Sequence, residues 1–121
     1  MAVERLVLPS DPHSALAFLR AASLTHPVVV FKRSPTCPIS HAAEARFRAW
    51  LATLCESDAL RWASIDVVSE RVLARGLTAA LAIPHESPQA LWFVNGELVW
   101  HASHDALTHE RLVRAFAQAP A

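Results

Sequence analysis

The chain has 121 residues, 53% of them hydrophobic, and its 11 Lys and Arg residues balance its 11 Asp and Glu residues. That length fits one domain covering residues 1–121, and the balanced charge gives no electrostatic footprint for binding nucleic acid. No apolar run approaches the ~18 residues that a membrane-spanning helix needs, which argues against a membrane protein.

Helical and strand patterns alternate in the first part of the chain. Asp11 and Pro12 are typical of a helix start. Residues 28–32 are rich in β-branched side chains and predict a strand. From Pro38, apolar residues recur at helical spacing and predict a long amphipathic helix. The expected apolar faces are Leu16, Phe18, Leu19 and Ala22 for the first helix, and Ala43, Phe47, Trp50, Leu51 and Leu54 for the second.

The middle of the chain predicts a second strand and a third helix. Residues 62–67 have strand character. Ser69 is a candidate N-cap for a helix that extends to about Leu81. Gly76 lies inside this helix and weakens it by ~1 kcal/mol relative to alanine.

The last part predicts a hairpin and a closing helix. Residues 89–94 and 97–102 are expected strands, joined by the strong hairpin signal Asn95-Gly96. Thr108 can cap a final helix. The order α, β, α, β, α, β, β, α predicts a thioredoxin-like fold with three α/β/α layers and a central four-stranded mixed sheet. The residues expected to face inward are Leu112, Val113 and Phe116 of the final helix, and the four tryptophans Trp50, Trp62, Trp92 and Trp100.

Cys37 carries the strongest chemical signal in the chain. It follows the first predicted strand and precedes Pro38, a residue favoured at the first position of a helix, so Cys37 is the expected N-cap. There the backbone N–H groups of Ile39 and Ser40 and the positive end of the helix dipole favour a thiolate. The Ser40 hydroxyl can add a further hydrogen bond to the sulfur. Because Ser40 stands where a dithiol oxidoreductase has its second cysteine, the motif predicts a one-thiol redox site.

Three segments of the chain resemble the monothiol bacilliredoxin family. The resemblance extends from about Phe31 to Leu112. It departs from the family pattern at Arg33, where we expect histidine, and at Ala82, where we expect glycine. Arg33 is expected to alter the charge near the thiol. The three segments are residues 31–40 with Thr36-Cys37-Pro38-Ile39-Ser40, residues 85–89 with Ser87-Pro88, and residues 100–104.

The resemblance implies a thioredoxin-like enzyme that removes bacillithiol, a low-molecular-weight bacterial thiol, from S-bacillithiolated proteins. Cys37 would form the mixed disulfide, and bacillithiol would be a co-substrate with no tightly bound cofactor. Pro88 would follow a cis peptide bond and face Cys37, as the fold implies. The backbone of Ser87 would pair with the extended chain of the substrate protein. The residues next to Cys37 at this binding surface are Thr36, Pro38 and Ile39.

Three more residues are candidates for contact with the small thiol. Lys32 ends the first predicted strand and could screen the thiolate or bind a carboxylate of bacillithiol. His85 and Glu86 lie beside Ser87-Pro88 and could shape the thiol pocket.

The other cysteine and the paired histidines have simpler interpretations. Cys55 lies near the end of the second predicted helix, where packing or partial exposure is expected rather than a resolving role. His101 and His104 have the spacing of a metal pair, but no cysteine or carboxylate ligand accompanies them, so we expect no metal site. The first residues show no secretory leader, and two cysteines without one predict a reduced, cytoplasmic protein.

Two other functions stay open on the sequence alone. Cys37 and a small thiol could hold an iron–sulfur cluster between two subunits, as in some one-cysteine glutaredoxins, and a brown colour lost on chelation would indicate this. The chain could also be a redox-inactive binding module that docks partners near Pro88, and failure to react with mixed disulfides would indicate that.

Overall fold

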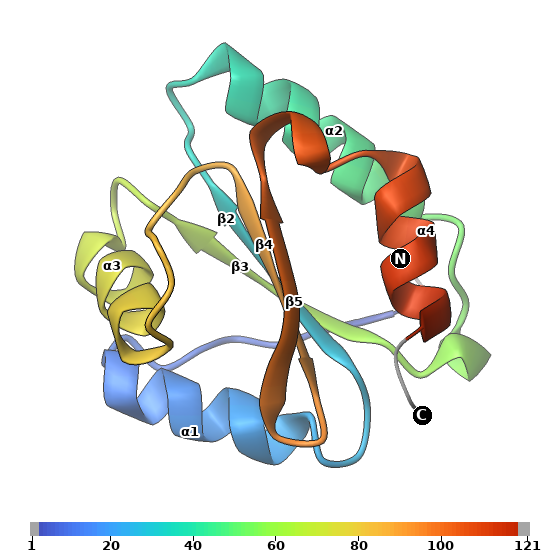
Figure 1. The fold of residues 1–121 in the computed structure, drawn as a ribbon, viewed down its shortest axis with the longest axis horizontal. Helices are drawn as coiled ribbons and strands as arrows, with labels where there is room; N and C mark the ends of the chain where they lie inside the picture. Colours follow the sequence, from blue (N-terminus) through green and yellow to red (C-terminus); the bar gives the residue numbers. More distant parts are fainter. Residues whose placement is uncertain (1–2, 119–121) are drawn as a thin grey trace.

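The computed structural model describes residues 3–118, which form one sheet between two layers of helices (Figure 1). Within these residues no helix is long and apolar enough to cross a membrane. The strands are β1 (Glu4–Arg5), β2 (Val28–Arg33), β3 (Arg61–Asp66), β4 (Gln89–Val94) and β5 (Glu97–Ser103). The helices are α1 (Pro12–Ala22), α2 (Pro38–Leu51), α3 (Arg71–Ala80) and α4 (His109–Gln118), with short 3-10 turns η1 at Glu56–Asp58 and η2 at His104–Ala106.

The sheet has the strand order β1-β3-β2-β4-β5. β1 and β2 run parallel to β3, whereas β4 runs antiparallel to both β2 and β5. The predicted three-layer thioredoxin-like fold is therefore confirmed, but the prediction of four strands is wrong, because β1 adds a fifth. A strand of two residues is too short to show the alternation by which strands are recognised in a sequence.

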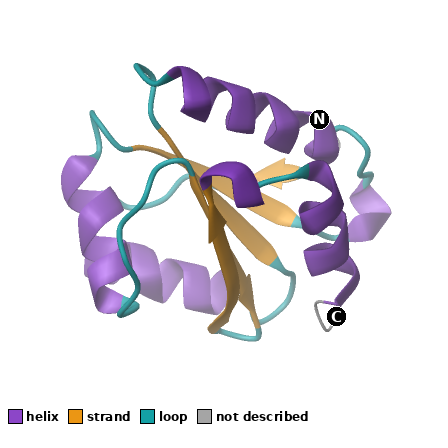
Figure 2. Cartoon of the chain, turned by 45° about the horizontal axis from the view of Figure 1, so that its top comes forward, coloured by secondary structure: helices purple, strands orange, loops and turns teal. Residues whose placement is uncertain are grey.

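β2 lies at the centre of the sheet and packs on both faces. Val29 and Phe31 belong to the hydrophobic core beside α2 and α4. Val28 and Val30 belong to the core beside α1 and α3. All four side chains are buried, and Figure 2 shows the helices on the two sides of the sheet. Burial on both faces explains why β2 is a continuous apolar run and not an alternating one.

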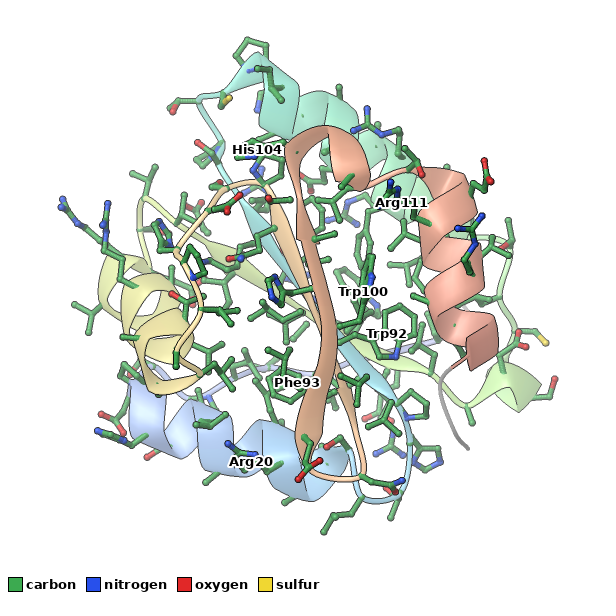
Figure 3. All side chains as sticks on the ribbon, in the orientation of Figure 1. Arg20, Trp92, Phe93, Trp100, His104 and Arg111 are labelled. Atoms are coloured by element: carbon green, nitrogen blue, oxygen red, sulfur yellow. The ribbon has the colours of Figure 1, made fainter. Side chains whose placement is uncertain are left out.

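Tryptophan side chains fill the core beside α2 and α4, as predicted. Trp50, Trp62 and Trp92 are buried, and Trp100 is partly buried against them. The ring centroids of Trp50 and Trp92 lie 5.6 Å apart, within the range of favourable aromatic pairs. Figure 3 shows Trp92 and Trp100 on the α4 side of the sheet and Phe93 on the α1 side, as alternation along a strand requires.

Two predicted helix starts are confirmed by side-chain caps. The Asp11 carboxylate accepts the Ser14 N–H at 2.9 Å, and the Thr108 hydroxyl accepts the Arg111 N–H at 3.1 Å. The predicted Ser69 cap is wrong, since the N-cap position of α3 is Glu70. The Ser69 N–H instead donates to the Asp66 carboxylate, which orders the turn before α3.

Some predicted apolar faces are also wrong in detail. Ala15 and Leu19 are the buried residues of α1, whereas Phe18 is 37% exposed. In α4, Leu112 is buried and Val113 is 45% exposed. A single residue at the edge of an apolar stripe turns outward when its helix rotates slightly on the sheet, which spacing alone does not fix.

Gly76 has a packing role in α3. A Cβ atom placed on it would lie 2.4 Å from Cγ of Pro12, at the start of α1. Gly76 therefore allows α1 and α3 to approach closely.

We predict that Gly76→Ala destabilises the protein by about 1 kcal/mol, because overpacking of about 1–3 kcal/mol outweighs the helix-propensity gain of about 1 kcal/mol. Urea unfolding measures the change. In the background of Pro12→Gly, which removes both clashing atoms of residue 12, Cγ at 2.4 Å and Cβ at 2.8 Å, the same substitution should become neutral or stabilising. A stabilising Gly76→Ala in the unmodified chain would contradict this account.

Ala82 follows the C-cap of α3, Leu81, and has a left-handed conformation with a φ of 57°. Its N–H bonds the Ala79 carbonyl, and the Ile83 N–H bonds the Thr78 carbonyl, both at 3.1 Å. These two bonds form a Schellman motif, in which glycine is the favoured residue at the Ala82 position. The geometry gives a physical reason for the glycine that the family resemblance leads us to expect at position 82.

We predict that Ala82→Gly stabilises the protein by about 1 kcal/mol, because glycine adopts this conformation without the clash of a Cβ atom. The matched control is Ala79→Gly, at an exposed helical residue one turn earlier, which should destabilise by about 1 kcal/mol. Urea midpoints of the two variants should therefore move in opposite directions. Midpoints that move together would refute the conformational explanation.

Candidate active site

Cys37 stands at the N-cap of α2 with an extended backbone (φ −107°, ψ 120°), and Pro38 begins the helix. The thiol is free and partly exposed. Thr36 and Pro38 are exposed on either side of it, and Ile39 is 57% exposed. The residue with the redox signal is therefore accessible to a second molecule and has exposed neighbours that such a molecule would touch.

The hydrogen bonds expected at the sulfur are not formed in this state. The Cys37 side chain makes no capping bond to α2, which corrects the expectation for Ile39 and Ser40. The Ser40 hydroxyl is fully buried and accepts the Ser34 N–H at 2.8 Å. Ser40 thus has a structural role in the thiol loop (residues 34–37), which sequence reasoning missed.

His41 also shapes the thiol loop. Its Nε2 lies 2.8 Å from the Pro35 carbonyl oxygen, and its backbone N–H bonds the Cys37 carbonyl at 3.0 Å. The loop is therefore held to the first turn of α2 from both ends.

The pairing of β2 with β4 places the proline loop (residues 84–88) at the same end of the sheet as the thiol loop (Figure 1). Lys32 and Gln89 are partners in this ladder, so the thiol loop leaves β2 where the proline loop enters β4. The Ser87–Pro88 peptide bond is cis, as expected, and Pro88 is buried. The Ser87 hydroxyl oxygen is buried and has no hydrogen-bond partner among the described residues.

Lys32 does not reach the surface. Its side chain is fully buried, and Nζ lies 2.7 Å from Nδ1 of His85 and 2.9 Å from Oε1 of Gln89. The prediction that Lys32 binds a carboxylate of the small thiol is therefore wrong for this conformation. Strand alternation explains the error, because Lys32 lies on the same face of β2 as Val28 and Val30, which packs beside α1 and α3.

The other side of the proline loop is held by residues at the end of β5. The Ser103 hydroxyl donates to the Glu86 carboxylate, and Nδ1 of His104 lies 3.4 Å from the same carboxylate. The His104 N–H also bonds the Pro88 carbonyl at 3.1 Å. Glu86 is thus engaged within the protein, and His104 holds the proline loop through its side chain and its backbone N–H.

The charge of Arg33 is paired. Its Nε lies 2.8 Å from Glu44, on α2, and its Nη1 lies 3.4 Å from Asp66, at the end of β3. Burial opposes ionisation of Glu44, but hydrogen bonds from Arg33 and Arg48 lower the pKa of Glu44 below its usual value. The expectation that Arg33 alters the charge near the thiol is therefore weakened, since two carboxylates balance it.

Cys55 lies beyond the opposite end of α2. The helix ends at Leu51, and Cys55 is exposed with its sulfur 2.9 Å from the Ser57 hydroxyl. A helix of 14 residues is about 21 Å long, whereas the Cα atoms of a disulfide lie within about 7 Å of each other. Cys55 therefore cannot resolve a disulfide at Cys37 within this fold.

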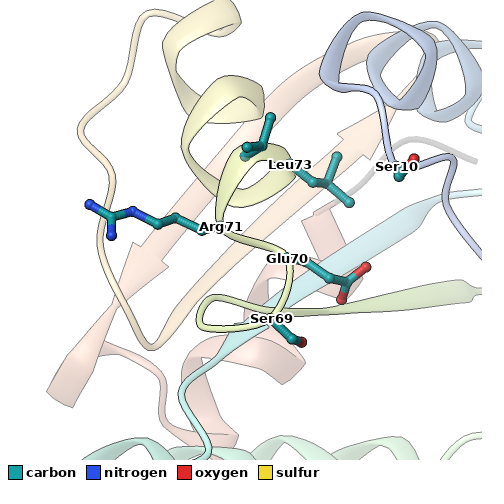
Figure 4. Close-up of a pocket in the computed structure, with 6 residues that line it drawn as sticks. Ser10, Ser69, Glu70, Arg71 and Leu73 are labelled. Atoms are coloured by element: carbon teal, nitrogen blue, oxygen red, sulfur yellow. The ribbon is translucent and has the colours of Figure 1, made fainter.

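Figure 4 shows a pocket of about 250 Å³ at the start of α3. The Arg71 guanidinium extends away from Ser10 and Glu70, so the pocket gathers no matched charges. None of its lining residues belongs to the thiol loop or the proline loop. Over the part of the chain that the structure describes, no three His, Cys, Asp or Glu side chains are grouped as metal ligands.

Comparison with known proteins finds one matching family and a similar solved structure. The family described as monothiol bacilliredoxin BrxC matches residues 12–112. A proposed oxidoreductase with a thioredoxin fold is 33% identical, covers 94% of this chain and 93% of its own, and superposes with a TM-score of 0.70. These similarities support thiol redox chemistry in general.

More distant structures support the fold alone. Thioredoxin of Malassezia sympodialis is 15% identical, with a TM-score of 0.68 over 100% of this chain and 94% of its own. Thioredoxin of Fasciola hepatica is 16% identical, with a TM-score of 0.67 over 98% of this chain and 100% of its own.

The buried Lys32 makes stability depend on pH. Burial, and then the positive charge of Arg75, lower the pKa of Lys32 from 10.5 to about 8, while Glu86 opposes this change. Between these two pH values the unfolded chain holds the proton that the folded chain has lost. The free energy of unfolding therefore rises with pH across this window.

We predict that this rise disappears in Lys32→Met. Urea unfolding of both proteins between about pH 7 and pH 10.5 checks it, because contributions from groups other than Lys32 are common to both proteins and cancel in the difference. Parallel stability curves would show that Lys32 keeps its ordinary protonation in the fold.

Proposed function

Since the chain belongs to the monothiol bacilliredoxin family, we propose that Cys37 removes bacillithiol from S-bacillithiolated proteins by thiol–disulfide exchange. The observation that carries the proposal is the partly exposed Cys37 at the start of α2, with the other cysteine beyond the far end of that helix. Bacillithiol is the co-substrate, and S-bacillithiolated proteins are the partners.

The reaction has two exchange steps. The Cys37 thiolate attacks the bacillithiol sulfur of the modified protein, so a Cys37–bacillithiol disulfide forms and the protein leaves as a thiolate, which takes a proton from water. A second bacillithiol thiolate then attacks the bacillithiol sulfur of this adduct. Oxidised bacillithiol leaves, and the Cys37 thiolate is regenerated. One free bacillithiol is consumed overall: its sulfur is oxidised to the disulfide level as the protein sulfur is reduced to a thiol, and the transferred bacillithiol sulfur keeps its oxidation level.

The helix start assists the second step more than the first. A thiolate stabilised by helix-terminal N–H groups is a weaker nucleophile, but it is also a better leaving group. The N–H groups of Ile39 and Ser40 have no partner within α2 because they lie in its first turn. They are available to the Cys37 sulfur once it carries negative charge.

The surroundings of Cys37 suit a protein substrate. Thr36, Pro38 and Ile39 offer an exposed, mainly apolar contact next to the sulfur. On the proline loop, the backbone of Ser87 would pair with an extended chain of the substrate protein.

We predict that Cys37→Ser abolishes release of bacillithiol from a bacillithiolated test protein, with a loss of at least a hundredfold, because serine is a far weaker nucleophile at neutral pH. Cys55→Ser is the matched control and should keep the wild-type rate. Mass spectrometry of Cys55→Ser should find one bacillithiol adduct, on Cys37.

Three results would reject the proposal. Loss of activity in Cys55→Ser alone would make Cys55 the nucleophile. A brown dimer that dissociates on chelation, without exchange activity, would indicate an iron–sulfur carrier. Failure of Cys37 to react with any mixed disulfide would indicate a binding module.

A further inference from the structure

Lys32 is a buried amine that the proposed exchange reaction does not use. It lies on β2, the strand that leads to Cys37, and its Nζ contacts His85 at 2.7 Å and Gln89 at 2.9 Å. Both contacts belong to the segment that contains Pro88. The amine therefore links the strand that carries the thiol loop to the proline loop.

Gln89 extends this link along the loop backbone. Its Oε1 also accepts the Glu86 N–H at 3.3 Å, and its Nε2 donates to the Pro84 carbonyl at 3.1 Å. Two backbone groups of the proline loop are thus held by one amide, and that amide is held by Lys32. Loss of the Lys32 contact would loosen the loop at both points.

The protons on this network are fixed by simple donor and acceptor rules. A lysine ammonium can only donate, so Nδ1 of His85 must accept, and the imidazole must be neutral with its proton on Nε2. A second proton on His85 would place an N–H donor against the ammonium at 2.7 Å. The contact therefore exists only while His85 is uncharged.

The charges around His85 oppose that second proton. Burial, and then the positive charges of Lys32, Arg75 and Arg71, lower the pKa of His85 below its usual value. Glu86 is the acidic group that acts on Lys32, and it is itself in contact with Ser103 and His104. Over the residues described, Lys32 has no carboxylate at ion-pair distance.

We propose that Lys32 and His85 are positioning residues that hold the proline loop beside Cys37, and that protonation of His85 loosens the part of the loop that is held through Lys32 and Gln89. The consequence for exchange rates rests on the proposed function. The structural part does not, because the loop contacts are made between residues of the chain itself. The pair would thereby limit productive docking to conditions in which His85 is neutral.

The first test follows the loop without any substrate. Nitrogen NMR of His85 and the hydrogen-exchange protection of the Glu86 amide are measured between about pH 5 and pH 8. We expect the Nε2–H tautomer at neutral pH and about a tenfold loss of protection as His85 titrates, which is the effect of losing one hydrogen bond.

Two variants separate positioning from a general structural role. His85→Gln keeps an acceptor for Lys32 but cannot gain a proton, so its Glu86 protection should stay constant across the same range. His85→Leu removes the acceptor and should show low protection at every pH. Identical pH dependence in wild type and His85→Gln, or a neutral-pH proton on Nδ1, would overturn the proposal.

The second test compares rates of Cys37 with two disulfides. A small aromatic disulfide measures the reactivity of Cys37 alone. A bacillithiolated protein must also dock on the proline loop. The rate with the bacillithiolated protein divided by the rate with the small disulfide should fall about tenfold for wild type as the pH is lowered from about 8 to about 5. The same ratio should stay constant for His85→Gln. If the NMR results hold but wild type releases no bacillithiol, the proposed function fails and the loop inference stands. If the rate ratio falls equally in wild type and in His85→Gln, the loop inference is overturned.

Discussion

The site depends on the last pair of residues in the β2–β4 ladder. Lys32 and Gln89 are paired in the backbone register, and their side chains are joined by a hydrogen bond of 2.9 Å. Because β2 continues into the thiol loop and β4 begins directly after Pro88, this pair determines which segments face each other at the edge of the sheet. Burial of β2 on both faces holds its register, since a slip of one residue would turn a lysine toward the core beside α2 and α4.

The electrostatics of the site follow from how its cations are placed. Arg33 is balanced by Glu44 and Asp66, and Lys32 is buried on the face of the sheet beside α1 and α3, away from α2. Neither cation serves as a free counter-ion for Cys37. The groups at the start of α2 that face a residue at the N-cap are backbone N–H groups, which are fixed dipoles. Fixed dipoles at short range are less sensitive to salt than an exposed ion pair would be.

The sequence was sufficient for features that repeat along the chain or have a local signature. Periodicity placed the four helices and the four longer strands, and Cys37 followed by Pro38 identified the start of α2. The Asn95-Gly96 turn has positive φ at both residues, as that hairpin type requires. Single hydrogen bonds were less predictable. Ser40 binds Ser34 and not the sulfur, which depends on how the loop folds back.

The burial of Lys32 can be predicted in part from the sequence. Val28 and Val30 lie on one face of β2, so alternation alone assigns Lys32 to the same face and away from Cys37. What the sequence does not show is its partners, because His85 and Gln89 approach only through the β2–β4 pairing. A buried amine is tolerated when hydrogen-bond acceptors surround it. The same contacts make Lys32 a link between the thiol loop and the proline loop, and the position of one loop relative to the other sets what can reach the sulfur.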